Sequence, residues 1–416
     1  INGGRTTSID YLQDGVTLGT GRGHKVSSMS PDIDAVQEFK VVTNGISAEY
    51  GRVSGGLVEI VTQSGTNQFH GQLYEYIQND AFNANSWRQN ALGGKKTPFR
   101  QNDFGFTFGG PVWIPKIYQG RNRTFFFADY EGYRFKQSGS LQTANVPTEA
   151  ERSGDFSATY ANNIPTMMYD PNGPVAPQLD ANGSPTGVYE RLALLGGDGK
   201  HVPASMISPI SAAILKLVPL PNQRGNLSSS SQANFVAPQD TNNQNDRWSV
   251  RLDQNFGPNQ RLFGRFSTIT TDNGATRWFG PLSTASTTAY HGGRLFTLNY
   301  DWTLSPTLLF NARAGVNHDP QTSGTPLPLE FNNSSLGLPA IMTQILGNAN
   351  IPTIQTDFMG AFNPGTTSGL NRVNSTAYNV GFSFTKILGR HTLKAGYEGR
   401  RYYDNYYTSG NGVMSF

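Results

Sequence analysis

The sequence predicts an all-β protein whose strands cross a membrane, and three observations support this fold class. First, the 416 residues include 47 glycines, 12% aromatic residues and only 15% charged residues, whereas soluble domains average about 25% charged residues. Second, about nine segments alternate apolar with polar or small residues over the 9–11 positions that a membrane-crossing strand needs. Third, short and long connections alternate between these segments, as they do in membrane β-barrels.

Residues 1–66 have a different pattern and predict a small α+β unit. A strand-like piece within Arg5–Val16 ends at the Asp14-Gly15 turn. Ser30 and Pro31 are helix-start residues, which predicts a brief helix from Asp32 to Gln37. Strands are predicted at Glu38–Thr43 and Leu57–Thr62, separated by a single helical turn in Ala48–Arg52. The second strand is apolar on both parities, so we expect it to be buried on most of both faces.

The alternation is clearest in the later strands. In 293–303, Phe296, Leu298 and Trp302 share one parity, while Asn299 and Asp301 share the other. It is weakest in the first strand, where Glu75 has the parity of its apolar neighbours. The nine predicted strands are 69–78, 102–113, 123–135, 246–256, 261–271, 293–303, 307–318, 375–386 and 391–403.

The connections assign a direction to the strands. The short ones lie near 114–122, 257–260, 304–306 and 388–390, and the long ones at 79–101, 136–245, 272–292 and 319–374. Barrels of this class have short periplasmic turns and long extracellular loops. The loops at 136–245 and 319–374 are therefore the best candidates for ligand contact, and Ile207–Leu217 has the apolar spacing of a helix within the first.

Aromatic side chains lead to two further expectations. Phe125, Phe126 and Phe127 are consecutive, so at least one should face the barrel interior. Aromatic residues near strand ends are typical of the girdles at membrane interfaces. The residues expected there are Trp113, Tyr133, Trp248, Trp302, Tyr402 and Tyr403.

The sequence offers no support for catalysis, a cofactor or nucleic-acid binding. It has no cysteine and a net charge of +3, with scattered lysines and arginines. No Gly-x-Ser-x-Gly elbow or dinucleotide-binding glycine pattern occurs. The histidines are dispersed without metal-ligand spacing: His24, His70, His201, His291, His318 and His391. We therefore expect neither an enzyme nor a metal site.

Several phrases in a fixed order carry a family resemblance. The stretch Ala48–Gly71, AEYGRVSGGLVEIVTQSGTNQFHG, resembles the end of a TonB-dependent receptor plug entering the first barrel strand. The phrases QNDFGFTFGGPV, RTFFFADYEGYR, VPTEAERSGDF, PLPN and RLDQNFGPNQRLFGRF resemble the Oar-like branch, which usually carries an N-terminal carboxypeptidase-regulatory-like domain.

The resemblance implies that residues 1–66 are the C-terminal part of a plug domain and that 67–416 are the first part of a barrel of about 22 strands. It implies a location in the outer membrane of a Gram-negative bacterium, in contact with outer-membrane lipid. It also implies uptake of an unknown small or oligomeric ligand, driven by TonB and an inner-membrane energising complex through a segment missing here. We interpret both ends as cut, so the fragment should not close into a barrel by itself.

The resemblance further implies a latch in which Glu49 and Arg52 of the plug pair with charges of the barrel wall. Ligand-binding residues remain unknown, and a siderophore, an oligosaccharide, a peptide and cobalamin all stay open as ligands. Two alternative functions also stay open. One is surface adhesion or a structural role with the same barrel, and the other is a secreted β-rich carbohydrate-binding module.

Overall fold

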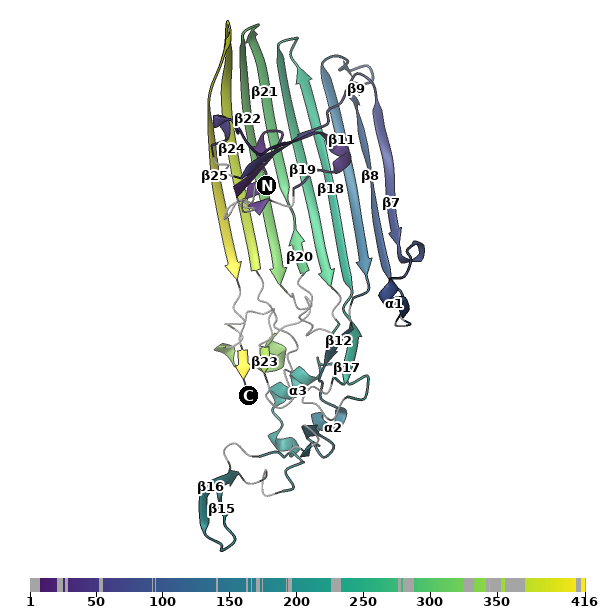
Figure 1. Ribbon diagram of the computed structural model, residues 1–416, viewed down its shortest axis with the longest axis vertical. Helices are drawn as coiled ribbons and strands as arrows, with labels where there is room; N and C mark the ends of the chain where they lie inside the picture. Colours follow the sequence, from purple (N-terminus) through teal and green to yellow (C-terminus); the bar gives the residue numbers. More distant parts are fainter. Residues whose placement is uncertain are drawn as a thin grey trace.

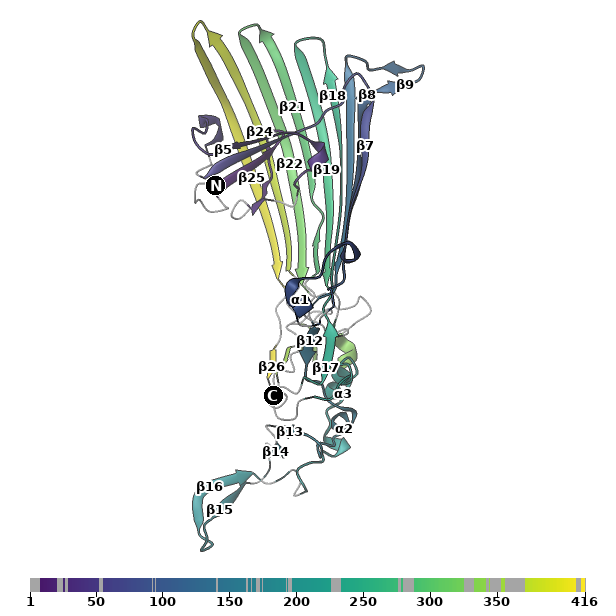
Figure 2. The same cartoon turned by 45° about the vertical axis from the view of Figure 1, so that its right-hand side comes forward.

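The computed structural model shows one large curved sheet, a small N-terminal sheet against it and a group of loops at one end (Figures 1 and 2). It describes the whole chain except residues 1–7, 21–24, 27–28, 52–54, 92, 94, 140, 162–163, 166, 170–172, 174, 192, 194–196, 226–232, 276–277, 280–287, 325–332, 342–343, 345–352, 356–370, 409–412 and 416.

The large sheet is an antiparallel meander in which each strand pairs with the next along the chain. Its order is β7-β8-β11-β18-β19-(β20, β21)-β22-β24-β25, and β20 and β21 together occupy one position between β19 and β22. The strands are β7 His70–Asn79, β8 Phe99–Pro111, β11 Thr124–Gln137, β18 Thr241–Asn255, β19 Gln260–Ala275, β20 Thr288–His291, β21 Arg294–Ser305, β22 Leu308–Gly324, β24 Asn371–Leu388 and β25 His391–Thr408.

All nine predicted strands are present, but several extend further toward the long connections. β24, for example, has 18 residues, whereas about ten suffice to cross the hydrocarbon layer. The short connections lie together at one end of the sheet and the long ones at the other (Figure 1). Within the described residues, no helix is long and apolar enough to cross a membrane.

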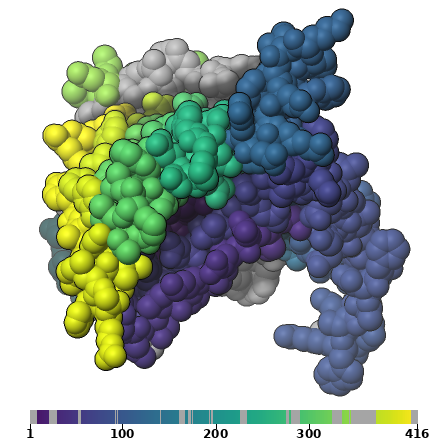
Figure 3. Space-filling view, turned by 90° about the horizontal axis from the view of Figure 1, so that it is seen from above, coloured from purple at the N-terminus to yellow at the C-terminus, as the bar shows by residue number. Residues whose placement is uncertain are grey.

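The two faces of the sheet meet different surroundings. On the convex face, Leu298 and Phe382 remain 38% and 47% exposed. Their neighbours of opposite parity on the concave face are polar and buried, as Thr297 and Asn379 illustrate. Seen from above, the sheet forms an arc around the N-terminal sheet (Figure 3). The observed parity is the predicted one.

The N-terminal sheet has the order β2-β1-β6-β5. Its strands are β1 Ile9–Gln13, β2 Val16–Thr17, β5 Val36–Val42 and β6 Gly56–Thr62, with a separate pair of β3 Gly19–Thr20 and β4 Lys25–Val26. β6 is an inner strand, parallel to β1 and antiparallel to β5. Leu57, Val58 and Ile60 are all buried, which agrees with the prediction of a strand covered on both faces.

One predicted helix is wrong. Residues 32–37 form only a 3₁₀ turn, Ile33–Ala35, which Asp32 caps by accepting a hydrogen bond from the Asp34 N–H at 3.0 Å. Val36 already pairs with Thr62 as the first residue of β5. The ladder with β6 therefore overrides the local helix-start signal. The helical turn predicted after residue 47 is confirmed as Ala48–Tyr50.

The loops at the far end contain short elements. They are the 3₁₀ turns Asp80–Phe82, Ala204–Met206 and Asn333–Leu336, the helices α1 Trp87–Ala91, α2 Glu149–Arg152 and α3 Pro209–Leu215, and the strands β12 Leu141–Ala144, β13 Tyr160–Ala161, β14 Ile164–Pro165, β15 Val175–Leu179, β16 Pro185–Arg191, β17 Phe235–Pro238, β23 Thr353–Gln355 and β26 Val413–Ser415; β9 Trp113–Ile114 and β10 Tyr118–Gln119 lie in a short connection. The predicted helix at Ile207–Leu217 is confirmed as α3.

Two residues expected in the aromatic girdle face the opposite way. Tyr133 pairs directly with Asp103 and Asn245. It has the same parity in β11 as Glu131, which faces Asp32 of the N-terminal segment. Tyr402 has the parity of Arg400, which binds Asp10 of the N-terminal sheet. Both tyrosines therefore lie on the concave face. The alternation of side chains along a strand decides which face a residue points to, whatever its distance from the strand end. Phe127 also faces inward and is 2% exposed, as expected for one of the three phenylalanines.

Candidate functional site

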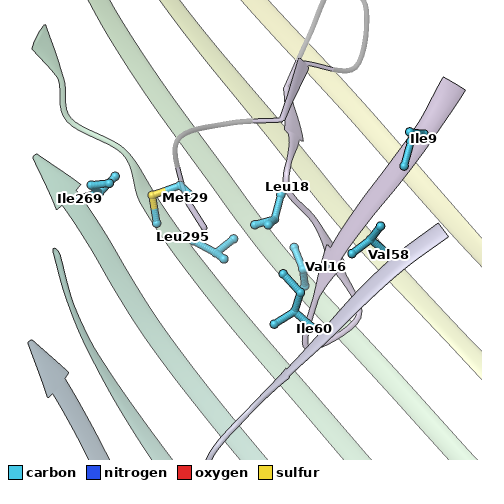
Figure 4. Close-up of a cluster of buried hydrophobic side chains, with 8 residues drawn as sticks. All are labelled: Ile9, Val16, Leu18, Met29, Val58, Ile60, Ile269 and Leu295. Atoms are coloured by element: carbon cyan, nitrogen blue, oxygen red, sulfur yellow. The ribbon is translucent and has the colours of Figure 1, made fainter. Parts of the chain in front are cut away.

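The candidate site is the interface between the N-terminal sheet and the concave wall, which has a small apolar centre. Six side chains of residues 9–60 pack on Ile269 of β19 and Leu295 of β21 (Figure 4). Two wall glycines allow this approach. A Cβ on Gly315 would lie 2.5 Å from Val16, and one on Gly293 would lie 2.5 Å from the Met29 sulfur, so a side chain at either position would require its neighbour in the N-terminal segment to move.

A buried charge network surrounds Asp14, at the turn between β1 and β2. Its carboxylate accepts hydrogen bonds from the Thr62 N–H at 3.0 Å and the Thr62 hydroxyl at 2.8 Å. It also lies 3.8 Å from Nη1 of Arg251 and 3.7 Å from Nη1 of Arg265. All three charged side chains are at most 5% exposed. Asp14 thus balances two buried arginines of the wall.

The wall holds these arginines in position from the other side. Arg251 forms a forked pair with Asp253, with N–O distances of 2.8 and 2.9 Å, and lies 3.9 Å from the centre of the Phe263 ring. It also donates to the Thr62 carbonyl at 3.0 Å. Arg265 lies 3.7 Å from Asp129 of β11. A planar guanidinium with several fixed donors suits such a shared role.

A second network includes Glu49, the predicted latch residue. Glu49 binds Arg313 of β22 at 3.2 Å and also Lys394 of β25. Arg313 in turn binds Glu398 at 2.6 Å. Glu398 also pairs with Arg400, which binds Asp10 of β1 at 2.6 Å. The first network uses β18 and β19 and this one uses β22 and β25, so the N-terminal sheet is tied to the wall at separate points.

A third contact lies on the side of β7. Asp32 accepts a hydrogen bond from the Tyr74 hydroxyl at 3.0 Å. The Tyr74 side chain passes over Gly105, because a Cβ at that position would lie only 2.4 Å from the hydroxyl. Arg247 of β18 pairs with Glu131 of β11 at 3.3 Å. The N-terminal sheet is therefore held by polar contacts from β7 to β25.

A cavity of about 420 Å³ opens beside the Asp14 and Glu49 networks. Its lining includes Tyr50, Glu59 and Arg313. Burial raises the pKa of Tyr50 to about 12, and the carboxylates of Glu59 and Glu49 add to this shift. The phenol is consequently neutral at physiological pH and adds no charge to the interface.

The predicted latch residues have different outcomes. Glu49 contacts two cationic residues of the wall, while Arg52 lies outside the described residues. The latch function itself stays a prediction. Sequence reasoning missed Asp10, Asp14 and Asp32. Asp14 has a φ of 49° and is followed by Gly15 at 81°. The Asp-Gly pair therefore predicts a turn and does not indicate that the carboxylate binds arginines, which lie far away in the sequence.

Among the described residues, no group of three or more His, Cys, Asp or Glu side chains is arranged so that it could hold a metal ion. His201 in the long loop lies 2.8 Å from Asp198 and 3.4 Å from Asp155, all exposed. Hydrogen bonds from the Lys200 N–H and from His201 hold the pKa of Asp198 below its usual value. The cluster closes the loop between α2 and residue 203, where Val202 donates to the Gly154 carbonyl at 2.8 Å.

Comparison with known proteins identifies the family of this chain. Residues 61–416 match the family described as Outer membrane beta barrel domain. The TonB-dependent transporter Oar of Myxococcus xanthus is 28% identical over 172 residues, covering 37% of this chain and 14% of that protein. The outer membrane transporter YddB from Escherichia coli has a TM-score of 0.49 and 9% identity, with 98% of this chain and 42% of that chain covered.

The siderophore receptor PirA from Acinetobacter baumannii gives a TM-score of 0.44 at 12% identity, covering 97% of this chain and 42% of that one. The chain therefore spans less than half the length of each of these three proteins.

Proposed function

Since this chain belongs to the outer membrane β-barrel domain family, we propose that it is part of a receptor that imports a ligand through TonB-coupled displacement of a plug. It is a protein of the outer membrane of a Gram-negative bacterium. In this proposal residues 1–66 are the C-terminal part of the plug, and 67–416 are the first part of the barrel. The long loops capture the ligand, and TonB with its inner-membrane complex supplies the force.

The observation that carries the proposal is the polar character of the interface. The apolar centre has eight buried side chains, while charge networks at Asp14, Glu49 and Asp10 join the sheet to the wall. Buried ion pairs add little net stability compared with apolar packing, and their groups regain hydration when they separate. Such an interface holds a resting position and can still come apart under force.

The experiment uses the full-length receptor in its own host. Glu49→Ala should loosen the N-terminal sheet and raise sensitivity to vancomycin, which is too large for intact outer membranes. Glu190→Ala, which removes an exposed carboxylate on the loop strand β16, is the control and should leave sensitivity unchanged. If both variants behave as the parent, the latch role of Glu49 is wrong.

Energised uptake is tested separately, because the ligand is unknown. Cells with and without the gene are grown in complex medium, and compounds depleted from the medium are identified by mass spectrometry. We expect at least one compound whose depletion needs the receptor and stops when a protonophore dissipates the proton gradient. Receptor-dependent attachment of cells without any such depletion would instead favour adhesion, the remaining alternative.

A further inference from the structure

A row of alternating aromatic and hydrogen-bonding residues crosses four adjacent strands of the concave wall. Tyr76 of β7 lies directly opposite Asp103 of β8, which lies opposite Tyr133 of β11, which lies opposite Asn245 of β18. Directly paired residues point to the same face of a sheet. The preceding row includes Tyr74, whose hydroxyl binds Asp32 of the N-terminal sheet. The row therefore lies on the concave face, one step closer to the long loops.

The aromatic rings of this region form a platform on the interior face of the sheet, where contact with lipid does not account for them. The Tyr133 and Phe135 rings are nearly parallel, 6.3 Å apart with 6° between their planes. Phe99 meets Phe135 edge-on at 5.5 Å, and Tyr76 is 60% exposed. Aromatic residues on the convex face meet hydrocarbon, but these rings face the interior, where barrels of this class are wet. Tyr76, on the edge strand β7, is the largely exposed ring, while Tyr133, Phe135 and Phe99 are half-buried, and all four present apolar ring surface on the interior side.

The polar residues between the rings are acceptors or amides, not cations. Asp103 Oδ1 and Asn245 Oδ1 are buried without a hydrogen-bond partner among the described residues. An unpaired buried acceptor costs about 1–3 kcal/mol, so each would gain from a hydroxyl donor reached by a small side-chain rotation. The next row adds Gln78, Gln101 and Asn243 around Phe135. Neither row contains a lysine or arginine, and Arg247 of the preceding row is paired with Glu131, so an anionic ligand or anionic metal chelate would find no unpaired cation among these residues.

We infer that this wall is one side of a binding site for a neutral oligosaccharide. Sugar rings present a flat C–H face that packs on aromatic rings and a rim of hydroxyls that donate to carboxylate and amide oxygens. Tyr76 and Tyr133 are two strands apart, or about 10 Å, a separation that two linked pyranose units can bridge around Asp103. The inference rests on the proposed function, because it names the substrate class of the same receptor.

The test is calorimetric titration of the full-length receptor with maltohexaose, cellohexaose and xylohexaose, with ferric citrate as the anionic comparator. The detergent is lauryldimethylamine oxide, because sugar-headed detergents would compete. We expect at least one hexaose to bind, and Tyr133→Ala to weaken that binding about tenfold, the loss of one stacked ring. Tyr133→Phe keeps the ring and should retain most of the affinity. Tyr130→Ala, on the convex face of the same strand, is the matched control and should bind as the parent does.

Each alternative result overturns the inference. It fails if none of the three hexaoses binds, if Tyr133→Ala binds as tightly as the parent, or if ferric citrate binds in a Tyr133-dependent way. The proposed function is tested independently by the protonophore-sensitive depletion described above. Energised uptake of another compound with no hexaose binding would contradict the inference and support the proposed function. Hexaose binding without energised uptake would support the inference and contradict the proposed function.

Discussion

At the scale of single residues, Asp14 shows how a turn position can carry an interface. The backbone of Asp14-Gly15 turns with both φ angles positive, a geometry that Asp and Gly tolerate best. The same turn points the carboxylate toward Arg251 and Arg265. Because both arginines also have acidic partners in the wall, Asp14 completes a charge balance that exists only when the two sheets are together.

Asp14→Asn in the full-length receptor should therefore loosen β1 and β6 with little effect on the wall. Removing one member of a buried ion pair costs about 3–5 kcal/mol, and the amide cannot replace the lost charge. Hydrogen exchange of residues 9–62 should accelerate markedly, while β18 and β19 exchange as before. Glu190→Gln, at an exposed position of the loop strand β16, is the control. Protection that is equal in the two variants would show that the carboxylate is not essential to the interface.

At the scale of elements, alternation of side chains was sufficient to predict all nine strands, because burial on one face imposes a period of two. Element ends were less predictable. β24 begins at Asn371, in a polar stretch where pairing with β22 extends the ladder beyond the apolar pattern. The helix predicted from Asp32 does not form because Val36 pairs with β6, and no local pattern predicts that pairing.

The candidate site was predictable only where the family resemblance marked it. Glu49 was predicted to contact the wall, but its actual partners, Arg313 and Lys394, lie more than 260 positions away and were not predicted. Tyr133 was assigned to the girdle from its position near a strand end, although its parity with Glu131 already placed it inside. To predict which distant charges pair, one must know which residues lie opposite each other in the sheet, and no local pattern of the sequence shows this.

The long loops also form elements that support one another. A common apolar core joins Val146, Ile214, Phe235, Phe279 and Leu336, from three separate loops. Arg152 at the end of α2 holds the end of α3, donating to the carbonyls of Leu215 at 2.7 Å, Val218 at 3.0 Å and Pro219 at 2.6 Å. One guanidinium thus satisfies carbonyls that a helix end leaves without partners.

Arg152→Ala should unravel the end of α3, because three carbonyls lose their donors at about 1–3 kcal/mol for each one left buried. Arg152→Lys should be nearly as damaging, since one ammonium cannot reproduce the planar fork. Brief trypsin or chymotrypsin treatment of intact cells should cleave both variants within 204–225. The exposed Arg191→Ala variant on β16 is the control. Resistance equal to the parent's would contradict the capping role.

At the scale of the whole molecule, the two faces of the large sheet should respond oppositely to an added charge. Leu298 faces outward on β21 and its neighbour Asn299 faces the interior cavity. Leu298→Arg should cost about 2–4 kcal/mol near the bilayer midplane, whereas Asn299→Arg should cost much less. Unfolding of the full-length receptor from liposomes measures both. Equal costs would mean that the convex face does not meet hydrocarbon.

The same architecture predicts how the 416-residue chain behaves when expressed alone. Within the described residues, β7 pairs only with β8, and β25 pairs only with β24. Each outer edge therefore carries backbone N–H and C=O groups without a strand partner, and such groups cannot remain in hydrocarbon because each costs several kcal/mol. We expect the isolated chain to aggregate or associate through these edges. A monomer that migrates faster on gels unless boiled would have closed its edges and would contradict the nine-strand arc as a free-standing fold. The full-length receptor, treated identically, is the positive control for such heat-modifiable migration.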